Sequence, residues 1–210
     1  MIRVLIVDDH ETVRRGLKEI FADEFPELAV CEASHSQAAL ELIASREWDL
    51  VLLDINIPGR SGLEVLQEAK RLRPQTPVLI LSAYPEAEFA LRSFKLGASS
   101  YLNKGRASDE LVAAAKKALA GGRYVTASLA EKLAAAVGGD FQQAPHDSLS
   151  NRELQVLRMV ARGGTIKEIA AELNLSEKTV GTYRTRISKK MGLATNVELA
   201  RYALQHRLVE

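Results

Sequence analysis

Three acidic side chains in this sequence stand directly behind apolar runs. Asp8 and Asp9 follow "VLIV", and Asp54 closes "LVLLD". If the fold gathers these carboxylates, they repel and raise one another's pKa, so a site that keeps them ionised should hold a cation. Mg²⁺ is the natural candidate because it takes carboxylate oxygens, keeps several waters and commonly completes its coordination with phosphate oxygens. The acidic residues therefore predict a magnesium site.

Two other polar residues stand at the ends of similar runs. Ser82 ends "PVLILS", and Lys104 follows "SSYLN". A hydroxyl and an ammonium beside the metal would contact the remaining oxygens of a phosphoryl group. A carboxylate that accepts phosphate becomes an acyl phosphate, which is a covalent arrangement known for aspartates in other folds. The whole set therefore predicts phosphoryl transfer to an aspartate.

The elements that must position these residues alternate along the first part of the chain. Helical patterns with apolar residues at i, i+3 and i+4 separate the apolar runs. Because parallel neighbours need right-handed crossovers, this alternation predicts an α/β fold, a doubly wound five-stranded parallel sheet of the flavodoxin-like kind. Ligands of such sheets gather beyond the carboxyl ends of the strands. We expect strands at residues 4–7, 28–33, 50–54, 77–82 and 99–103.

Length and charge indicate two modest domains. The 210 residues are 47% apolar and 26% charged, with a net charge of +1, which is ordinary for a globular protein. Residues 148–210 carry 11 Lys and Arg against 6 Asp and Glu. This basic end suggests a polyanion partner, although a solvated charged face is the commoner explanation of such a bias.

Other features indicate where the protein works and how it is divided. Cys31 is the single cysteine, so it has no partner for an internal disulfide, and the sequence shows neither a signal-like start nor an apolar run of membrane length. We therefore expect a cytoplasmic protein with no membrane partner. Gly, Gln, Pro and Asp around residues 138–148 indicate a linker. The expected parts are residues 1–122, a linker helix and flexible linker at 123–147, and residues 148–210.

The last part has the pattern of a small all-α helix-turn-helix domain. In "SNREL", Ser150 and Glu153 have the spacing of a capping box. A second short helical pattern, "TIKEIAAEL", is followed by a break at Asn174 and Leu175. Ser176 should then cap a helix over residues 176–191. Two short helices joined by a tight turn form a helix-turn-helix.

The helix expected over residues 176–191 has two different sides on a helical wheel. Val180, Tyr183, Ile187 and Met191 form one side and should hold the helix in its domain. The opposite side is small, polar and basic. Such a side suits the DNA major groove, which offers base edges to short side chains and phosphates to lysines. An ordinary solvated face is the alternative. The predicted DNA contacts are Lys178, Thr179, Gly181, Thr182, Thr185, Arg186 and Lys189.

The stretches "VDDH", "LLDINIPGRSG", "LSAY" and "YLNKG" resemble the receiver domain of bacterial two-component response regulators, over about the first 120 residues. The resemblance implies that Asp54 is the phosphoryl acceptor and that Ser82 and Lys104 contact the phosphoryl group. Tyr101 matches an aromatic that turns inward when Ser82 shifts toward the phosphate; the alternative is a half-buried strand aromatic. Receivers often have proline after the lysine, whereas this chain has Gly105. A cis bond without proline costs about 2.5–4 kcal/mol, so we expect either a trans bond or a strained loop there.

The same resemblance implies how the metal is held. Asp9 and Asp54 would ligate Mg²⁺ directly, with help from the backbone carbonyl of Asn56. Asp8 would orient a water of the ion's shell. In this interpretation the adjacent pair Asp8 and Asp9 seats the metal beside the acceptor.

Residues 148–208 resemble a LuxR-type helix-turn-helix domain, and its pairing with a receiver resembles the NarL/FixJ family, within which the tail is most similar to the BvgA-like branch. The family resemblance implies a transcription regulator, not an enzyme, that receives phosphate from a sensor histidine kinase. It implies binding to double-stranded promoter DNA, a homodimer when phosphorylated, and RNA polymerase as a further candidate partner. Many family members have lysine in place of Gly181 and histidine in place of Tyr183, so the DNA sequence that is read stays open.

Two other classes of function remain to be tested. A phosphatase or phosphotransferase with an aspartyl intermediate would share the chemistry, but the haloacid-dehalogenase pattern has D-x-D at the first strand where this chain has "DD". A regulator that acts through protein contact or RNA would keep the receiver and use the tail differently.

Overall fold

The computed structural model describes residues 1–84, 86–105, 108–127, 129–131, 144–206 and 208–209. The chain forms two compact units, Met1–Gly139 and Asp140–Glu210. The expected linker at 123–147 includes residues 132–143, which lie outside the described residues. No helix in the described parts of the chain has the length and apolar character needed to cross a membrane.

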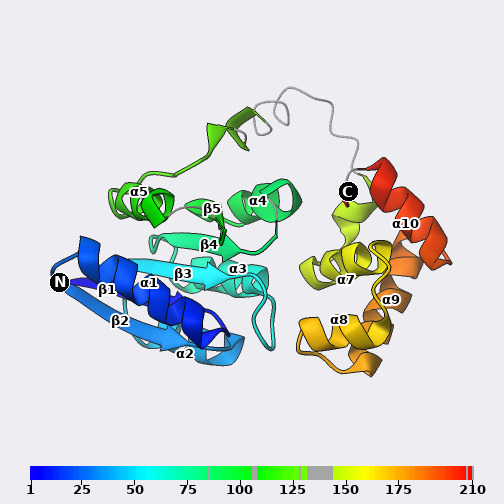
Figure 1. The fold of residues 1–210 in the computed structure, drawn as a ribbon, viewed down its shortest axis with the longest axis horizontal. Coiled ribbons are helices and arrows are strands. Elements are labelled where there is room, and N and C mark those ends of the chain that lie inside the picture. Colours follow the sequence, from blue (N-terminus) through cyan, green and yellow to red (C-terminus); the bar gives the residue numbers. More distant parts are fainter. Residues whose placement is uncertain (85, 106–107, 128, 132–143, 207, 210) are drawn as a thin grey trace. The chain divides into compact units, whose positions relative to one another are not determined.

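The first unit is built on a five-stranded parallel sheet (Figure 1). The strands follow the order β2-β1-β3-β4-β5. Their bounds are β1 Ile2–Val7, β2 Leu28–Ala33, β3 Leu50–Asp54, β4 Val78–Ser82 and β5 Ser100–Asn103. The five predicted strands and the predicted doubly wound fold are confirmed. Every residue of β3 and β4 is buried, which explains why these strands read as continuous apolar runs.

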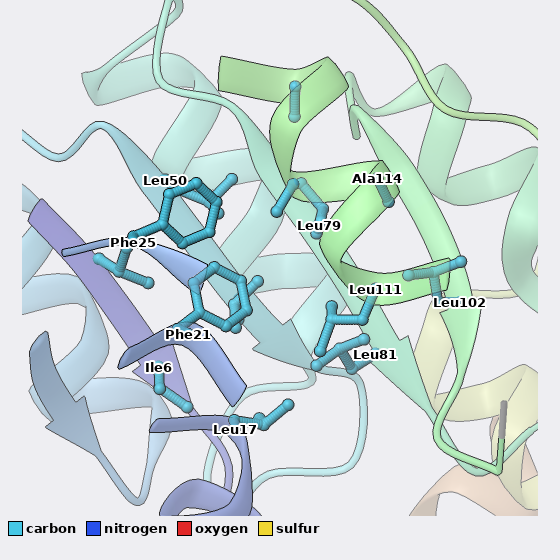
Figure 2. Packing of buried hydrophobic residues seen from close by; sticks show 14 residues of the cluster. Ile6, Leu17, Phe21, Phe25, Leu50, Leu79, Leu81, Leu102, Leu111 and Ala114 are labelled. Atoms are coloured by element: carbon cyan, nitrogen blue, oxygen red, sulfur yellow. The ribbon is translucent and has the colours of Figure 1, made fainter. Parts of the chain in front are cut away.

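Five helices connect and cover these strands. They are α1 Glu11–Glu24, α2 Ser36–Ser45, α3 Gly62–Leu72, α4 Glu86–Lys95 and α5 Ser108–Leu119. On one face of the sheet, Phe21 of α1 and Leu111 of α5 pack over strand residues such as Leu79 and Leu81 (Figure 2). This apolar core fixes α1 and α5 against the sheet, so that the loops at the strand ends have a rigid support.

The register of the sheet brings the predicted site residues to one edge. Val7 pairs with Leu53, so Asp8 lies level with Asp54. Asp54 in turn pairs with Leu81, and Ser82 pairs with Asn103. Because all the strands are parallel, the residues that end them lie at the same carboxyl edge.

The second unit consists of short helices, several of which begin at capping residues that the sequence analysis identified. A 3₁₀ turn, η1 (Pro145–Ser148), precedes α7 (Asn151–Ala161), α8 (Ile166–Glu172), α9 (Glu177–Met191) and α10 (Asn196–Gln205). Ser150 and Glu153 form the predicted capping box at α7, and the Ser176 hydroxyl accepts a hydrogen bond from the Thr179 N–H at the start of α9. Between α8 and α9, Asn174 has a φ of 52°, which lets the chain turn sharply. The predicted helix-turn-helix is confirmed.

Candidate functional site

Lys104 joins two of the predicted acidic residues. Its Nζ lies 2.8 Å from Asp54 Oδ2 and 2.6 Å from Asp8 Oδ2. Asp8 is 1% exposed and Asp54 is 3% exposed, whereas the Lys104 side chain keeps 19% of its exposure. The structure therefore gathers side chains from the ends of β1, β3 and β5 into one buried, charged pocket.

The charges in this pocket alter one another's protonation. Burial is the largest reason that the pKa of Asp54 is raised above its ordinary value, and the nearby charge of Asp8 adds to it, although Lys104 and the backbone N–H of Asn56 oppose the rise. Burial alone would lower the pKa of Lys104, but the carboxylates of Asp54 and Asp8 outweigh it and raise that pKa. Lys104 is therefore held as a cation. Its charge only partly offsets the effect of burial on the neighbouring Asp54 carboxylate.

The residues of this pocket fit a magnesium ion by the chemistry of their donor atoms. Asp8, Asp9 and His10 offer ligand atoms that lie within 4.8 Å of one another. Lys104 connects Asp8 to Asp54, so that among the described residues the three predicted carboxylates are grouped around one ammonium. Hard carboxylate oxygens and this excess of negative charge are what Mg²⁺ requires of a protein.

His10 is a further residue of the site that the sequence analysis did not single out. Its Nδ1 lies 2.8 Å from Asp9 Oδ1 and 3.3 Å from Asp8 Oδ1. Its backbone N–H also donates to Asp8 Oδ1 at 2.9 Å. The signal that could have found it is its position directly after "DD".

The backbone behind Asp54 is held by a glycine. A Cβ on Gly62 would overlap the Asp54 carbonyl oxygen and lie 2.7 Å from the Ile55 Cα. The Gly62 N–H donates to the Ile55 carbonyl at 2.8 Å. Helix α3 therefore starts directly against the end of β3, and only a residue without a side chain allows this close approach. The intervening loop contains Asn56, whose N–H binds the Asp54 carboxylate.

Ser82 and Tyr101 are connected through the loop that follows β4. The Ser82 hydroxyl accepts a hydrogen bond from the Tyr84 N–H at 3.0 Å, and the Tyr101 hydroxyl donates to the Tyr84 carbonyl at 3.0 Å. Tyr101 is 1% exposed, so its side chain lies inside the unit and not half-buried as in the alternative above. The described residues contain no cis peptide bond, so the Lys104–Gly105 bond is trans.

Helix α9 buries one side and exposes the other. Val180 and Ile187 are 0% exposed, and Tyr183 and Met191 are half-buried. The predicted DNA contacts lie away from this core. Among them, Thr179 and Gly181 are half-buried, and the exposed ones are Lys178, Thr182, Thr185, Arg186 and Lys189.

The basic residues of α9 divide into two groups. Arg184 donates to Asn196 Oδ1 at 2.7 Å and to the Ala194 carbonyl at 2.8 Å. Lys190 Nζ lies 2.6 Å from Glu153 Oε2. These two cations hold α9 to its neighbours. Within the described residues, three others make no ion pair and are available to a partner: Lys178, Arg186 and Lys189.

Comparison with known proteins gives both units a family. The profile described as response regulator receiver domain matches residues 4–116, and the profile described as bacterial regulatory proteins, luxR family, matches residues 147–203. The response regulator UvrY of Escherichia coli K12 is 36% identical over 209 residues, covering 99% of this chain and 96% of that protein. The chain belongs to the NarL/FixJ family of response regulators. The response regulator GacA of Pseudomonas aeruginosa is 37% identical over 211 residues, covering 100% of this response regulator and 99% of GacA.

Solved structures agree with this assignment. The crystal structure of a LuxR-family two-component response regulator from an Aurantimonas species matches with a TM-score of 0.59 and 31% identity, covering 65% of this response regulator and 98% of that chain. RcsB from Salmonella enterica, solved on the promoter rprA with the phosphomimetic BeF₃⁻, matches with a TM-score of 0.62 and 25% identity, covering 96% and 98% of the two chains. This response regulator is thus a transcription regulator with a receiver domain and a LuxR-type DNA-binding domain.

Proposed function

We propose that phosphorylation of Asp54 by a partner sensor histidine kinase switches promoter binding by this response regulator. The observation that carries the proposal is the ion pairing of Lys104 with both Asp54 and Asp8 in a buried pocket. A lysine fixed beside the acceptor carboxylate can stabilise the charge on phosphoryl oxygens during transfer. The receiver-domain match over residues 4–116 supports the same chemistry.

Mg²⁺ is the cofactor of this proposal. Asp9 and Asp54 would hold it through carboxylate oxygens together with the backbone carbonyl of Asn56, and Asp8 would orient a water of the ion's shell. When bound, the ion neutralises charge on the acceptor and on the phosphoryl oxygens. His10, in contact with both Asp8 and Asp9, orients these carboxylates.

The transfer itself needs an ionised Asp54. One of its carboxylate oxygens attacks the phosphorus of the donor phosphohistidine, the P–N bond breaks, and the imidazole leaves with the electron pair. Lys104 then exchanges its bond with Asp54 for one with a phosphoryl oxygen, and Ser82 contacts another. Apart from slow self-dephosphorylation the protein turns over no substrate, so we class it as a regulator and not an enzyme.

The switch begins at Ser82. Its hydroxyl is bonded to the Tyr84 N–H, so a shift toward the phosphoryl group changes the loop after β4. Tyr101 contacts the same loop through the Tyr84 carbonyl and follows that change. The phosphoryl group thus favours one of two arrangements of the receiver, which is what a ligand must do to act at a distance.

The proposed DNA contacts lie on the exposed side of α9. Lys178, Arg186 and Lys189 meet backbone phosphates, because they are exposed and make no ion pair within the described residues. Thr179 supports the start of the helix, where its N–H and hydroxyl bond to Ser176. Gly181 has no atom near the position of a Cβ, which lets the groove approach the helix backbone closely.

Thr182 and Thr185 are the proposed readers of bases. Their hydroxyls donate to the carbonyls of Lys178 and Gly181, at 2.9 and 3.0 Å. Because each hydroxyl proton is already donated within the helix, the hydroxyl can only accept hydrogen bonds from a nucleobase. Each threonine side chain also offers a methyl group. These groups match the amino group of adenine or cytosine and the methyl group of thymine in the major groove.

The remaining partners follow from the family. We propose that the phosphorylated protein forms a homodimer, that RNA polymerase is contacted at promoters, and that the protein works in the cytoplasm without a membrane partner. Dimerisation would match two half-sites on the DNA, as in other helix-turn-helix regulators.

Labelling with acetyl phosphate and Mg²⁺ tests the proposal. Asp54→Asn should abolish labelling, and Asp9→Asn should reduce it strongly by weakening the metal site. Asp49→Asn is the matched control, because Asp49 forms a more exposed ion pair with Arg3. Stoichiometric labelling of the Asp54→Asn protein would refute the acceptor assignment.

Two results would favour the other classes of function. Steady release of phosphate from diverse phosphomonoesters would identify a phosphatase. If the protein shows no salt-sensitive binding to duplex DNA, a regulator acting through protein or RNA becomes the better interpretation, because phosphate contacts make DNA binding depend on salt.

A further inference from the structure

The segment that follows α5 is attached to the start of α4 by a buried hydrogen bond. The Thr126 hydroxyl donates to Glu86 Oε2 at 2.9 Å, and both residues are 8% exposed. The Thr126 oxygen also accepts from the Leu129 N–H at 3.2 Å, and Leu129 is 2% exposed. We call residues 124–127 with Leu129 the strap. It lies in the first unit and precedes the DNA-binding unit along the chain.

Glu86 also follows closely after Ser82, the last residue of β4. Glu86 begins α4, two positions after Tyr84. The Tyr84 N–H binds the Ser82 hydroxyl, while the Tyr84 carbonyl accepts from the Tyr101 hydroxyl at 3.0 Å and from the Asn103 side chain at 3.4 Å. Ser82 and Glu86 are thus the two ends of one short loop that is bonded to β5.

We propose that the Thr126–Glu86 hydrogen bond couples the phosphorylation state of the receiver to the strap, with Glu86 and Thr126 as positioning residues. The inference rests on the proposed function, in which Ser82 responds to phosphate on Asp54. When Ser82 moves, the loop carries Glu86 with it. Either the strap then moves together with Glu86, or the hydrogen bond from Thr126 to Glu86 breaks. Breaking it would leave a buried carboxylate without that donor, which costs free energy. The strap is therefore biased toward a different position in each state.

Coupling of this kind is reciprocal. If phosphate on Asp54 changes DNA affinity through the strap, then bound DNA must change the phosphorylation equilibrium by the same factor. A purely structural role for Thr126, as a cap for the Leu129 N–H, would give no such effect. Glu86 substitutions separate the two roles because they leave the cap in place.

The experiment compares DNA affinity with and without phosphate on Asp54. The probe is a duplex that the wild-type full-length protein selects from a random-sequence pool, and phosphate is supplied as acetyl phosphate with Mg²⁺. For the wild type we expect the ratio of the two affinities to be about fivefold or more, which is the lower end of typical allosteric coupling. Thr126→Val and Glu86→Met should both bring the ratio close to one, while Asp54 is still labelled. Thr126→Ser, which keeps the hydroxyl, should keep the ratio.

Ser93→Ala is the matched control, since it removes another buried hydroxyl bond of α4, to the Phe89 carbonyl at 2.9 Å. The inference is overturned if Glu86→Met and Thr126→Val keep the wild-type ratio, or if only Thr126→Val loses it. Should Thr126→Val fail to fold, as judged by Trp48 fluorescence, Glu86→Met and Thr126→Ser decide the question. A wild-type ratio of one would instead contradict the proposed function and this inference together.

Discussion

Replacing Lys104 by methionine should reveal how strongly the carboxylate pocket depends on its one ammonium group. The substitution removes the ion pairs with Asp54 and Asp8, whose carboxylates are almost inaccessible to solvent. Breaking a buried pair by removing one partner costs about 3–5 kcal/mol. We expect the free energy of unfolding of the receiver to fall by about that amount at pH 7.5 in the presence of a chelator.

The loss should shrink as the pH is lowered. The pKa of Asp54 is raised by burial in the folded protein, so the folded state binds a proton more readily than the unfolded state, and protonation favours folding as the pH falls. Without Lys104 this effect grows, because a cation that opposes the rise is gone. The deficit of Lys104→Met should therefore be smaller at pH 5.5 than at pH 7.5, and millimolar Mg²⁺ should restore part of it at the higher pH.

Urea unfolding followed by tryptophan fluorescence is the appropriate assay. Trp48 is the single tryptophan of the chain and is 4% exposed in the receiver, so its signal reports this unit alone. Lys18→Met is the matched control, because Lys18 pairs with Glu32 at 3.6 Å on the surface and such a pair contributes about 0–1 kcal/mol. Equal stability of Lys104→Met and wild type in chelator, or a loss that does not depend on pH, would refute this account of the pocket.

Three predictions concern the DNA-binding unit. Ile187→Ala should destabilise it by about 2–5 kcal/mol in thermal unfolding followed by circular dichroism, because Ile187 is fully buried; an unchanged transition would be inconsistent with that packing. Lys190→Met should lower the free energy of unfolding of this unit by about 1 kcal/mol at neutral pH, because Lys190 is 40% exposed and solvent screens its ion pair. Although burial raises the pKa of Glu153, the hydrogen bond from Lys190 and those of the capping box lower it overall. A carboxyl group whose pKa is lowered by folding stabilises the folded state above its unfolded pKa of about 4.3, and this stabilisation is lost as the pH falls through the lower folded-state pKa. The stabilities of the variant and the wild type should therefore converge in acid. Lys178→Ala should weaken binding to most duplexes with a shallower salt dependence, whereas Thr182→Ala should cost about 1–3 kcal/mol on the selected duplex and little on random DNA; equal losses on both would rule out base reading.

The fold could be predicted because its signals are local. Each strand is a short apolar run, and Ser150, Glu153 and Ser176 mark helix starts by side-chain bonds to nearby backbone. The gathering of Asp8, Asp54 and Lys104 followed from one general rule, that the carboxyl ends of parallel strands share an edge.

The remainder depends on contacts between residues far apart in the sequence. The helical wheel put Lys189 and not Lys190 on the DNA-facing side of α9, but it could not show that Lys190 is bonded to Glu153 of α7. The contact between Thr126 and Glu86 spans forty residues, and no local pattern predicts it. His10 was missed because its partners are carboxylates and not other histidines.

The most direct test of the central claim is the affinity of the full-length protein for its selected duplex before and after treatment with acetyl phosphate and Mg²⁺. We predict tighter binding after treatment of the wild type and no change in affinity for Asp54→Asn. Trp48 fluorescence checks that the receiver is folded in both proteins. Equal affinity of the wild type in the two states, or the same gain in the Asp54→Asn protein, would contradict a switch that acts through phosphate on Asp54.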